Sequence, residues 1–156
     1  MYHATRDVLK RLDHVQCKFL KDVGVDDVTA LMEFNLAPLA VRRDIALLGV
    51  IHRTALGKGP PQFAEHFKRQ GHGKHKFSMH DPRAVCKTSL TKRSALGLVA
   101  ISNLLPADII STKSVPKFQQ GWQKLLKKAA SEGHPKGAEI FSPRDALATH
   151  PLVSIS

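Results

Sequence analysis

The sequence predicts a mainly α-helical protein, a small irregular bundle of about five helices with a basic loop and a poorly ordered C-terminal tail. Apolar residues recur at spacings of three and four in several segments, which is the period of one helix face. Glycine and proline fall between these segments, where they end one helix and begin the next. Hydrophobic residues make up 42% of the 156 residues, which is enough for one small core.

The first expected helix spans residues 5–23. Its apolar residues follow one another at spacings of four, three and four and therefore form one stripe: Val8, Leu12, Val15 and Phe19. Gly24 follows as a C-terminal stop. Cys17 lies beside apolar neighbours in this pattern, so we expect a buried or half-buried thiol.

A short helix is expected at residues 27–34, with three apolar side chains turned inward: Val28, Leu31 and Met32. Asp26 and Asp27 stand at its start, where a carboxylate can accept the free N–H groups of the first turn. We therefore interpret Asp26 or Asp27 as a helix cap, in preference to a pair of catalytic carboxylates.

The third expected helix begins at Pro38, which suits a first turn, and is closed by Gly57. Its apolar face consists of Leu39, Ile45, Leu47, Leu48, Val50 and Ile51. After the break at Gly59-Pro60-Pro61, a short helix is expected from Pro61 to Arg69. Phe63 and Phe67, four residues apart, would fix that helix to the core.

The second half begins with a stretch that has no apolar period. Residues 70–92 are rich in glycine, lysine and histidine and predict a mobile loop. We favour a helix over an extended run for residues 93–105, followed by a turn after Pro106. The last helix is expected at 114–131, capped by Ser114, with one apolar face: Phe118, Trp122, Leu125 and Ala129.

The formal net charge of +11 bears on partners and solubility rather than on the fold. Nine basic residues lie between Lys58 and Arg93, opposed by Glu65 and Asp81, and the excess belongs to the first five-sixths of the chain. Two cysteines make no disulfide framework, and neither a secretory signal nor a membrane-spanning run is visible. We expect an intracellular protein, nuclear or cytoplasmic and not secreted, with no membrane as partner.

Several segments resemble one protein family. Arg93–Leu98 (RSALGL), Asn103–Pro106 (NLLP) and Lys113–Gln119 (KSVPKFQ) resemble the segment after the polymerase core in reverse transcriptases of non-LTR, LINE-type retrotransposons. Upstream, Leu12–Leu20 and Phe34–Gly49 are similar to the helical thumb side of the same proteins. Where the relatives carry an aromatic residue before the NLLP motif, this chain has serine. Order and spacing carry the resemblance, which covers most of residues 8–130.

The resemblance implies a division of the chain into four parts. Residues 1–69 would be a helical thumb-like region, 70–92 a basic Gly/His/Lys loop, 93–131 a helical post-polymerase segment, and 132–156 a flexible tail. A polymerase of this class needs a palm with carboxylates that hold two metal ions, and one domain of this length has no room for it. We expect a non-catalytic fragment, whose partners would include the missing polymerase domains of a parent RNA-directed DNA polymerase.

Such a segment would grip RNA or DNA through the phosphate backbone, independently of base sequence and with strong salt dependence. The residues favoured for phosphate contacts are Arg42, Arg43, Arg53, Lys58, Lys68, Arg69, Lys74, Lys76, Lys92 and Arg93. Two other readings stay open. One is a helical protein–protein interaction module that uses the helices 5–23 and 114–131, and the other is an inert relic.

Other chemistry has weaker support in the sequence. The residues that could suggest a zinc site are His66, His72, His75, His80 and Cys86. His72 and His75 form one close pair, but His80 and Cys86 make a poor second pair for tetrahedral zinc, so a solvated loop is favoured. No nucleophile arrangement and no phosphate-binding glycine loop is present. We therefore expect no cofactor and no metal.

Overall fold

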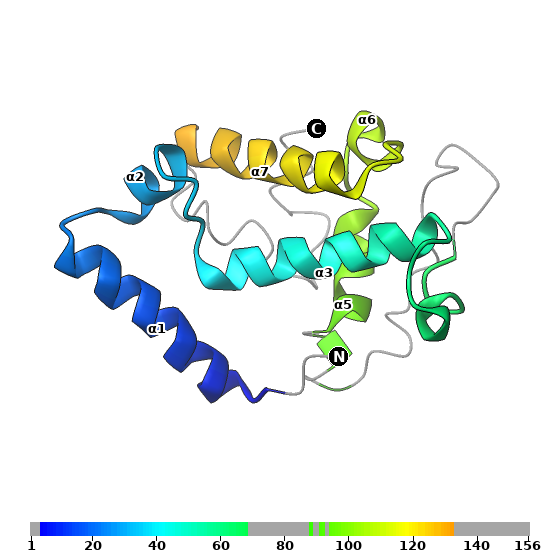
Figure 1. Ribbon diagram of the computed structural model, residues 1–156, viewed down its shortest axis with the longest axis horizontal. Coiled ribbons are helices and arrows are strands. Elements are labelled where there is room, and N and C mark those ends of the chain that lie inside the picture. Colours follow the sequence, from blue (N-terminus) through cyan, green and yellow to red (C-terminus); the bar gives the residue numbers. More distant parts are fainter. Residues whose placement is uncertain (1–3, 69–87, 89–90, 93, 133–156) are drawn as a thin grey trace.

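Helix α3 (Leu39–Ala55) is the element around which the described part of the chain is arranged. The computed structural model describes residues 4–68, 88, 91–92 and 94–132. Helices α5 (Ala95–Ser102) and α7 (Val115–Ser131) pack on α3, and α1 (Arg6–Asp22) also touches it. The short helices α2 (Asp27–Met32) and α6 (Ala107–Ile110) lie against α7, as Figure 1 shows. Within the described residues there is no strand, so the predicted mainly α-helical class is confirmed.

The core lies where α3, α5 and α7 meet. Its largest fully buried side chains are Val41, Leu48 and Ile51 from α3, Leu98, Val99 and Ile101 from α5, and Phe118, Trp122 and Leu126 from α7. Burial of a large apolar side chain is worth about 1.5–3 kcal/mol, so these three helices hold the fold together. Helix α5 is apolar nearly all round, which is the pattern of a helix buried on most sides.

One polar side chain belongs to this core. His52 is only 3% exposed, and its ring stacks on Phe118 with the centroids 4.0 Å apart and the planes 3° from parallel. Its Nε2 lies 2.8 Å from the backbone oxygen of Thr112, so the buried ring is hydrogen-bonded. The contact joins α3 to α7 and to the turn that precedes α7.

Helix ends follow the sequence rules closely. Thr5, Asp26, Ser94 and Ser114 cap the first turns of α1, α2, α5 and α7 through their side-chain oxygens. Gly24 and Gly57 follow α1 and α3 with φ angles of 70° and 73°, a left-handed conformation that glycine adopts without strain. The predicted helices at 5–23, 38–57, 93–105 and 114–131 are therefore all present, with slightly shorter bounds.

Two local predictions are wrong. Val28 and Met32 point outward, 56% and 39% exposed, whereas Leu31 is buried as expected. The buried residues of α2 are Ala30 and Leu31, so the buried face lies to one side of the predicted stripe. The helix expected from Pro61 to Arg69 is a 3-10 turn, Pro61–Phe63, followed by turns up to the last described residue of that stretch. Phe63 and Phe67 nevertheless make an edge-to-face contact at 6.1 Å, and Phe67 is buried.

The loop 70–92 and the tail 132–156 fall largely outside the described residues. Nothing in the described ranges is both long enough and apolar enough to be a membrane-spanning helix.

Helix α1 meets α3 through its polar side. Arg43 of α3 forms a two-pronged ion pair with Asp13, with Nη1 2.7 Å from Oδ1 and Nη2 donating to Oδ2 at 3.0 Å. Gln16 Nε2 donates to the backbone oxygen of Ala37 at 3.1 Å, and Leu20 is the buried residue of α1. These contacts settle which side of α1 faces the body of the protein.

Candidate interaction surfaces

The ten residues favoured for phosphate contacts do not form one structural group. Four of them lie outside the described residues: Arg69, Lys74, Lys76 and Arg93. Five others are exposed: Arg42, Arg53, Lys58, Lys68 and Lys92. Arg43 is the exception, because its side chain is 17% exposed and engages Asp13. Its structural role in fixing α1 explains its position better than a phosphate contact does.

Arg53 and Lys58 are brought together at the C-terminal end of α3. The Nε of Arg53 donates to the backbone oxygen of Lys58 at 2.9 Å, and the Lys58 N–H donates back to the backbone oxygen of Arg53 at 3.0 Å. Gly57 makes the turn possible through its left-handed φ. Cations at this end of a helix are stabilised by the helix dipole, so part of this arrangement serves the fold itself.

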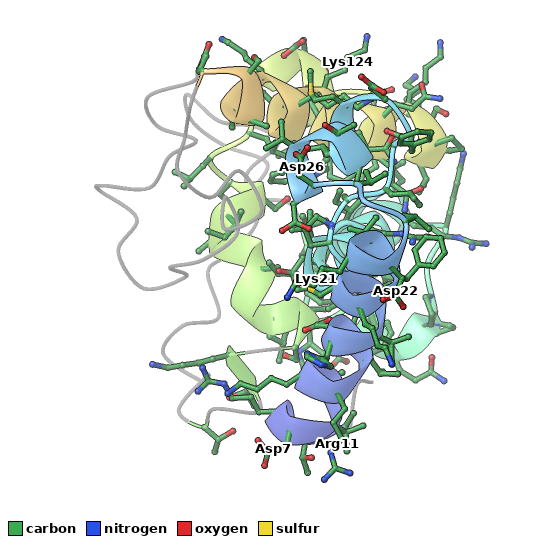
Figure 2. The ribbon with its side chains drawn as sticks, turned by 90° about the vertical axis from the view of Figure 1, so that its left-hand side faces the viewer. Asp7, Arg11, Lys21, Asp22, Asp26 and Lys124 are labelled. Atoms are coloured by element: carbon green, nitrogen blue, oxygen red, sulfur yellow. The ribbon has the colours of Figure 1, made fainter. Side chains whose placement is uncertain are left out.

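Sequence reasoning left the lysines of α7 out of the site, although they lie mostly outside its apolar stripe. Lys117 and Lys124 are exposed, and Figure 2 places Lys124 on the outer side of α7. Lys127 donates to the backbone oxygen of Met32 at 3.2 Å and so ties α7 to the end of α2. Lys128 lies 3.9 Å from Glu132. Their exposure could have been predicted from the sequence, because their spacing places them mostly outside the apolar face of the helix.

Positive charge is divided unequally along the chain. Residues 4–36, which contain α1 and α2, carry five Lys and Arg against six Asp and Glu. Residues 37–132 carry seventeen Lys and Arg against five Asp and Glu. The positive excess therefore belongs to the segment from α3 to α7, and the expectation that it spans the first five-sixths of the chain is too broad.

Of the carboxylate pair Asp26-Asp27, Asp26 is the cap of α2 and Asp27 is the first residue of the helix. Asp26 Oδ1 accepts from the backbone N–H of Val28 at 2.9 Å and of Thr29 at 3.0 Å. Its Oδ2 accepts from the Thr29 hydroxyl at 2.7 Å. The pKa of Asp26 is lowered below its ordinary value of 3.8, because these bonds stabilise the ionised form. The bond from the backbone N–H of Thr29 has the largest effect, and the bond from the Thr29 hydroxyl has the next largest. The cap prediction is confirmed.

Metal-ligating side chains do not gather in the part of the chain that the structure describes, where no group of three or more His, Cys, Asp or Glu could hold an ion. Of the histidines and the cysteine weighed for zinc, His66 is exposed, and the others lie outside the described residues: His72, His75, His80 and Cys86. Cys17 is an exposed free thiol, so the expectation of a buried or half-buried residue is wrong.

The apolar stripe of α1 is the second surface of the molecule. We define the α1 stripe as Val8, Leu12, Val15, Phe19 and Val23, whose exposed fractions are 47, 47, 66, 55 and 52%. An amphipathic surface helix ordinarily turns such a stripe to the core. Single exposed apolar residues are ordinary, but five on one side of a helix make the α1 stripe a candidate interaction surface.

Comparison of the chain with protein-family models, with curated proteins and with solved structures gives no match.

Proposed function

We propose that the chain is a non-catalytic helical segment of the reverse-transcriptase type, and that the part from α3 to α7 binds the phosphate backbone of RNA or DNA. The observation that carries this proposal is the division of charge, with seventeen cations against five anions over residues 37–132. Cations near phosphates release counterions, which gives affinity without sequence preference.

The exposed cations are spread over more than one element of this part. Arg42 lies in the first turns of α3, Arg53 and Lys58 at its C-terminal end, and Lys117 and Lys124 on α7. Such a distribution suits contacts along a backbone rather than a pocket for one base. In a parent polymerase, the resemblance implies that this part would lie beside the palm and contact template or primer.

The first experiment is a titration of the full chain with a fluorescently labelled single-stranded RNA at about 50 mM and about 200 mM salt. The proposal predicts binding at low salt that weakens steeply at the higher concentration. Absence of binding at low salt would contradict it. RNA-directed DNA synthesis by the purified chain would contradict the non-catalytic part.

A matched pair of variants then locates the surface. The triple substitution Arg42→Gln, Lys58→Gln and Lys68→Gln removes three exposed cations from the proposed part. The control, Lys10→Gln, Lys18→Gln and Lys21→Gln, removes three exposed cations from α1. Each lost phosphate contact on a single strand should reduce the slope of log affinity against log salt by about 0.7. Equal losses from both triples would contradict a defined surface.

A further inference from the structure

The outward side of α7 carries a row of lysines. Lys117, Lys124 and Lys128 follow one another at spacings of seven and four, so they lie within about 40° of one another around the helix. The centre of the buried face of α7 lies roughly 135° away from them. Lys113, just before the cap residue Ser114, adds a fourth cation at the N-terminal end. All four lysines are exposed, and we call them the α7 row; Figure 2 shows Lys124 at the outer edge of the molecule.

The α7 row opposes the electrostatics of its own helix. Lys117 lies in the first turn of α7, where the helix dipole favours an acidic residue and disfavours a cation. Helices α1 and α2 follow the usual rule, with Asp7 and Asp27 in their first turns. Lys124 and Lys128 stand four residues apart, a spacing at which like charges destabilise a helix. Charges that a helix does not need for its own stability indicate a functional surface.

The rest of this face offers hydrogen-bond donors and no stacking surface. Besides the lysines, α7 exposes Pro116, Gln120 and Ser131. Its two aromatic residues, Phe118 and Trp122, are fully buried. Aromatic side chains are what proteins use to stack the bases of a single strand. A ligand of this face is therefore held through anionic oxygens rather than through bases.

The spacing of the row suits the backbone of one nucleic-acid strand. Along the helix axis, Lys124 and Lys128 are roughly 6 Å apart and Lys117 and Lys124 are roughly 10 Å apart. Neighbouring phosphates of one strand are separated by a distance similar to the shorter spacing. A flexible single strand can follow this straight row over its whole length. The strands of a duplex wind around their axis and leave a straight row after a few phosphates.

Three anions border the row at its sides and end. Asp108 belongs to α6, and Glu33 follows α2, two helices that stand beside opposite ends of α7 in Figure 1. Glu132 closes the row, with its carboxylate 3.9 Å from Lys128. Residues 113–128 contain five lysines and no acidic residue, so the face keeps a positive excess over these three anions.

We propose that a single strand of RNA or DNA lies along the α7 row, with its phosphates at the lysines and its bases turned away from α7. This inference rests on the proposed binding of nucleic acid. It adds the surface on which the strand lies, and it makes a single strand rather than a duplex the ligand.

The test compares the full chain with two triple variants in a salt titration. The ligands are a labelled oligouridine of about 15 nucleotides and a duplex of the same length. The substitutions Lys113→Gln, Lys117→Gln and Lys124→Gln should reduce the slope of log affinity against log salt by about 2 on the single strand, because three contacts are lost at about 0.7 each. On the duplex the reduction should be half of that or less. The control is the α1 triple Lys10→Gln, Lys18→Gln and Lys21→Gln, which should leave both slopes unchanged.

The outcomes separate this inference from the proposed function. If the native chain binds neither ligand, the proposed function fails and the inference fails with it. If the native chain binds but the α7 triple keeps its slope, or loses more on the duplex, only the inference is overturned. The melting temperature of the α7 triple should not fall, since unfavourable charges are removed from the helix. A lower melting temperature would assign the lysines to the fold and overturn the inference.

A variant with a gain of affinity makes the test independent of folding. Glu132→Gln removes the anion at the end of the row and should raise the affinity for the single strand about twofold. Unchanged or weaker affinity would overturn the inference.

Two competitors test the other polyanions. Polyglutamate should displace the strand less readily than unlabelled oligouridine does, and the chain should not float with vesicles rich in phosphatidylserine through the α7 row. Equal displacement by polyglutamate, or flotation that the α7 triple abolishes, would assign the row to an acidic protein or a membrane and overturn the inference.

Discussion

Helices α1 and α7 share one sequence pattern, but the apolar stripe of α7 is buried and that of α1 is exposed. Each is 17 residues long, and each carries four apolar residues at spacings of four, three and four. In α7 the stripe starts with Phe118 and Trp122, both fully buried. In α1 it runs from Val8 to Phe19 and is about half exposed throughout. Periodicity therefore identifies an amphipathic helix, but it does not show what covers the apolar face of that helix.

The difference arises at α3. Its buried face is covered by α5 and α7, which leaves α1 at the side of the bundle, as Figure 1 shows. There α1 meets Arg43 and the backbone of Ala37 and presents Asp13 and Gln16 to them. Polar contacts with a fixed geometry therefore orient α1, whereas apolar burial orients α7.

The largest expected effect concerns the α7 side of the comparison. Trp122→Ala should lower the free energy of unfolding by about 3–5 kcal/mol, because a fully buried aromatic residue leaves a cavity between α3 and α7. Urea denaturation measures the change. Phe34→Ala is the control, since Phe34 is 59% exposed and should change stability by about 0.5 kcal/mol or less. Similar losses from both variants would refute the assignment of the core.

A smaller effect is expected at the contact that orients α1. In a double-mutant cycle with Asp13→Ala and Arg43→Ala, the coupling should be about 1 kcal/mol, because the pair is two-pronged but partly exposed. Amide hydrogen exchange in α1 should accelerate in both single variants, and exchange in α7 should not. Additive losses of stability would show that the pair does not hold α1 in place.

The smallest effect is the pH dependence of the α2 cap. The folded-state pKa of Asp26 is lowered, so its stabilising contribution is present above the ordinary value of 3.8 and is lost as the pH falls through the folded value. Asp26→Asn keeps a capping oxygen and removes the charge. The difference in melting temperature between the native chain and this variant should shrink as the pH falls below 3.8 and through the lowered folded-state pKa. A difference independent of pH would contradict the charged cap.

Much of the fold was predictable because its signals are local. The capping residues Thr5, Ser94 and Ser114 and the glycines after α1 and α3 lie within a few positions of the ends that they define. The short helix expected after Pro61 is only partly formed. After the 3-10 turn, the backbone N–H groups of His66 and Phe67 donate to the Phe63 oxygen and make one further turn, and the side chain of Phe67 is buried.

The candidate site was less predictable, because its determinants are distant in the sequence. Arg43 is of the residue type that binds phosphate, but its guanidinium donates to the carboxylate of Asp13, thirty positions earlier in the sequence. The exposure of Cys17 and of the α1 stripe depends on which side of α1 meets α3, and helical periodicity leaves that rotation open. The cap at Asp26 was predictable, because an aspartate side chain at a helix start bonds to backbone N–H groups of the same turn.

The α1 stripe forms no part of the chain's own folded core, since its five side chains are 47–66% exposed. Equilibrium urea unfolding of the Val15→Ser and Phe19→Ser variant tests it most directly, with Phe118→Ser and Leu126→Ser of α7 as the matched pair. The account predicts that the α1 variant changes the free energy of unfolding by about 0.5 kcal/mol or less, whereas the α7 variant no longer folds. A loss of several kcal/mol in the α1 variant would show that the stripe is buried and would contradict the account.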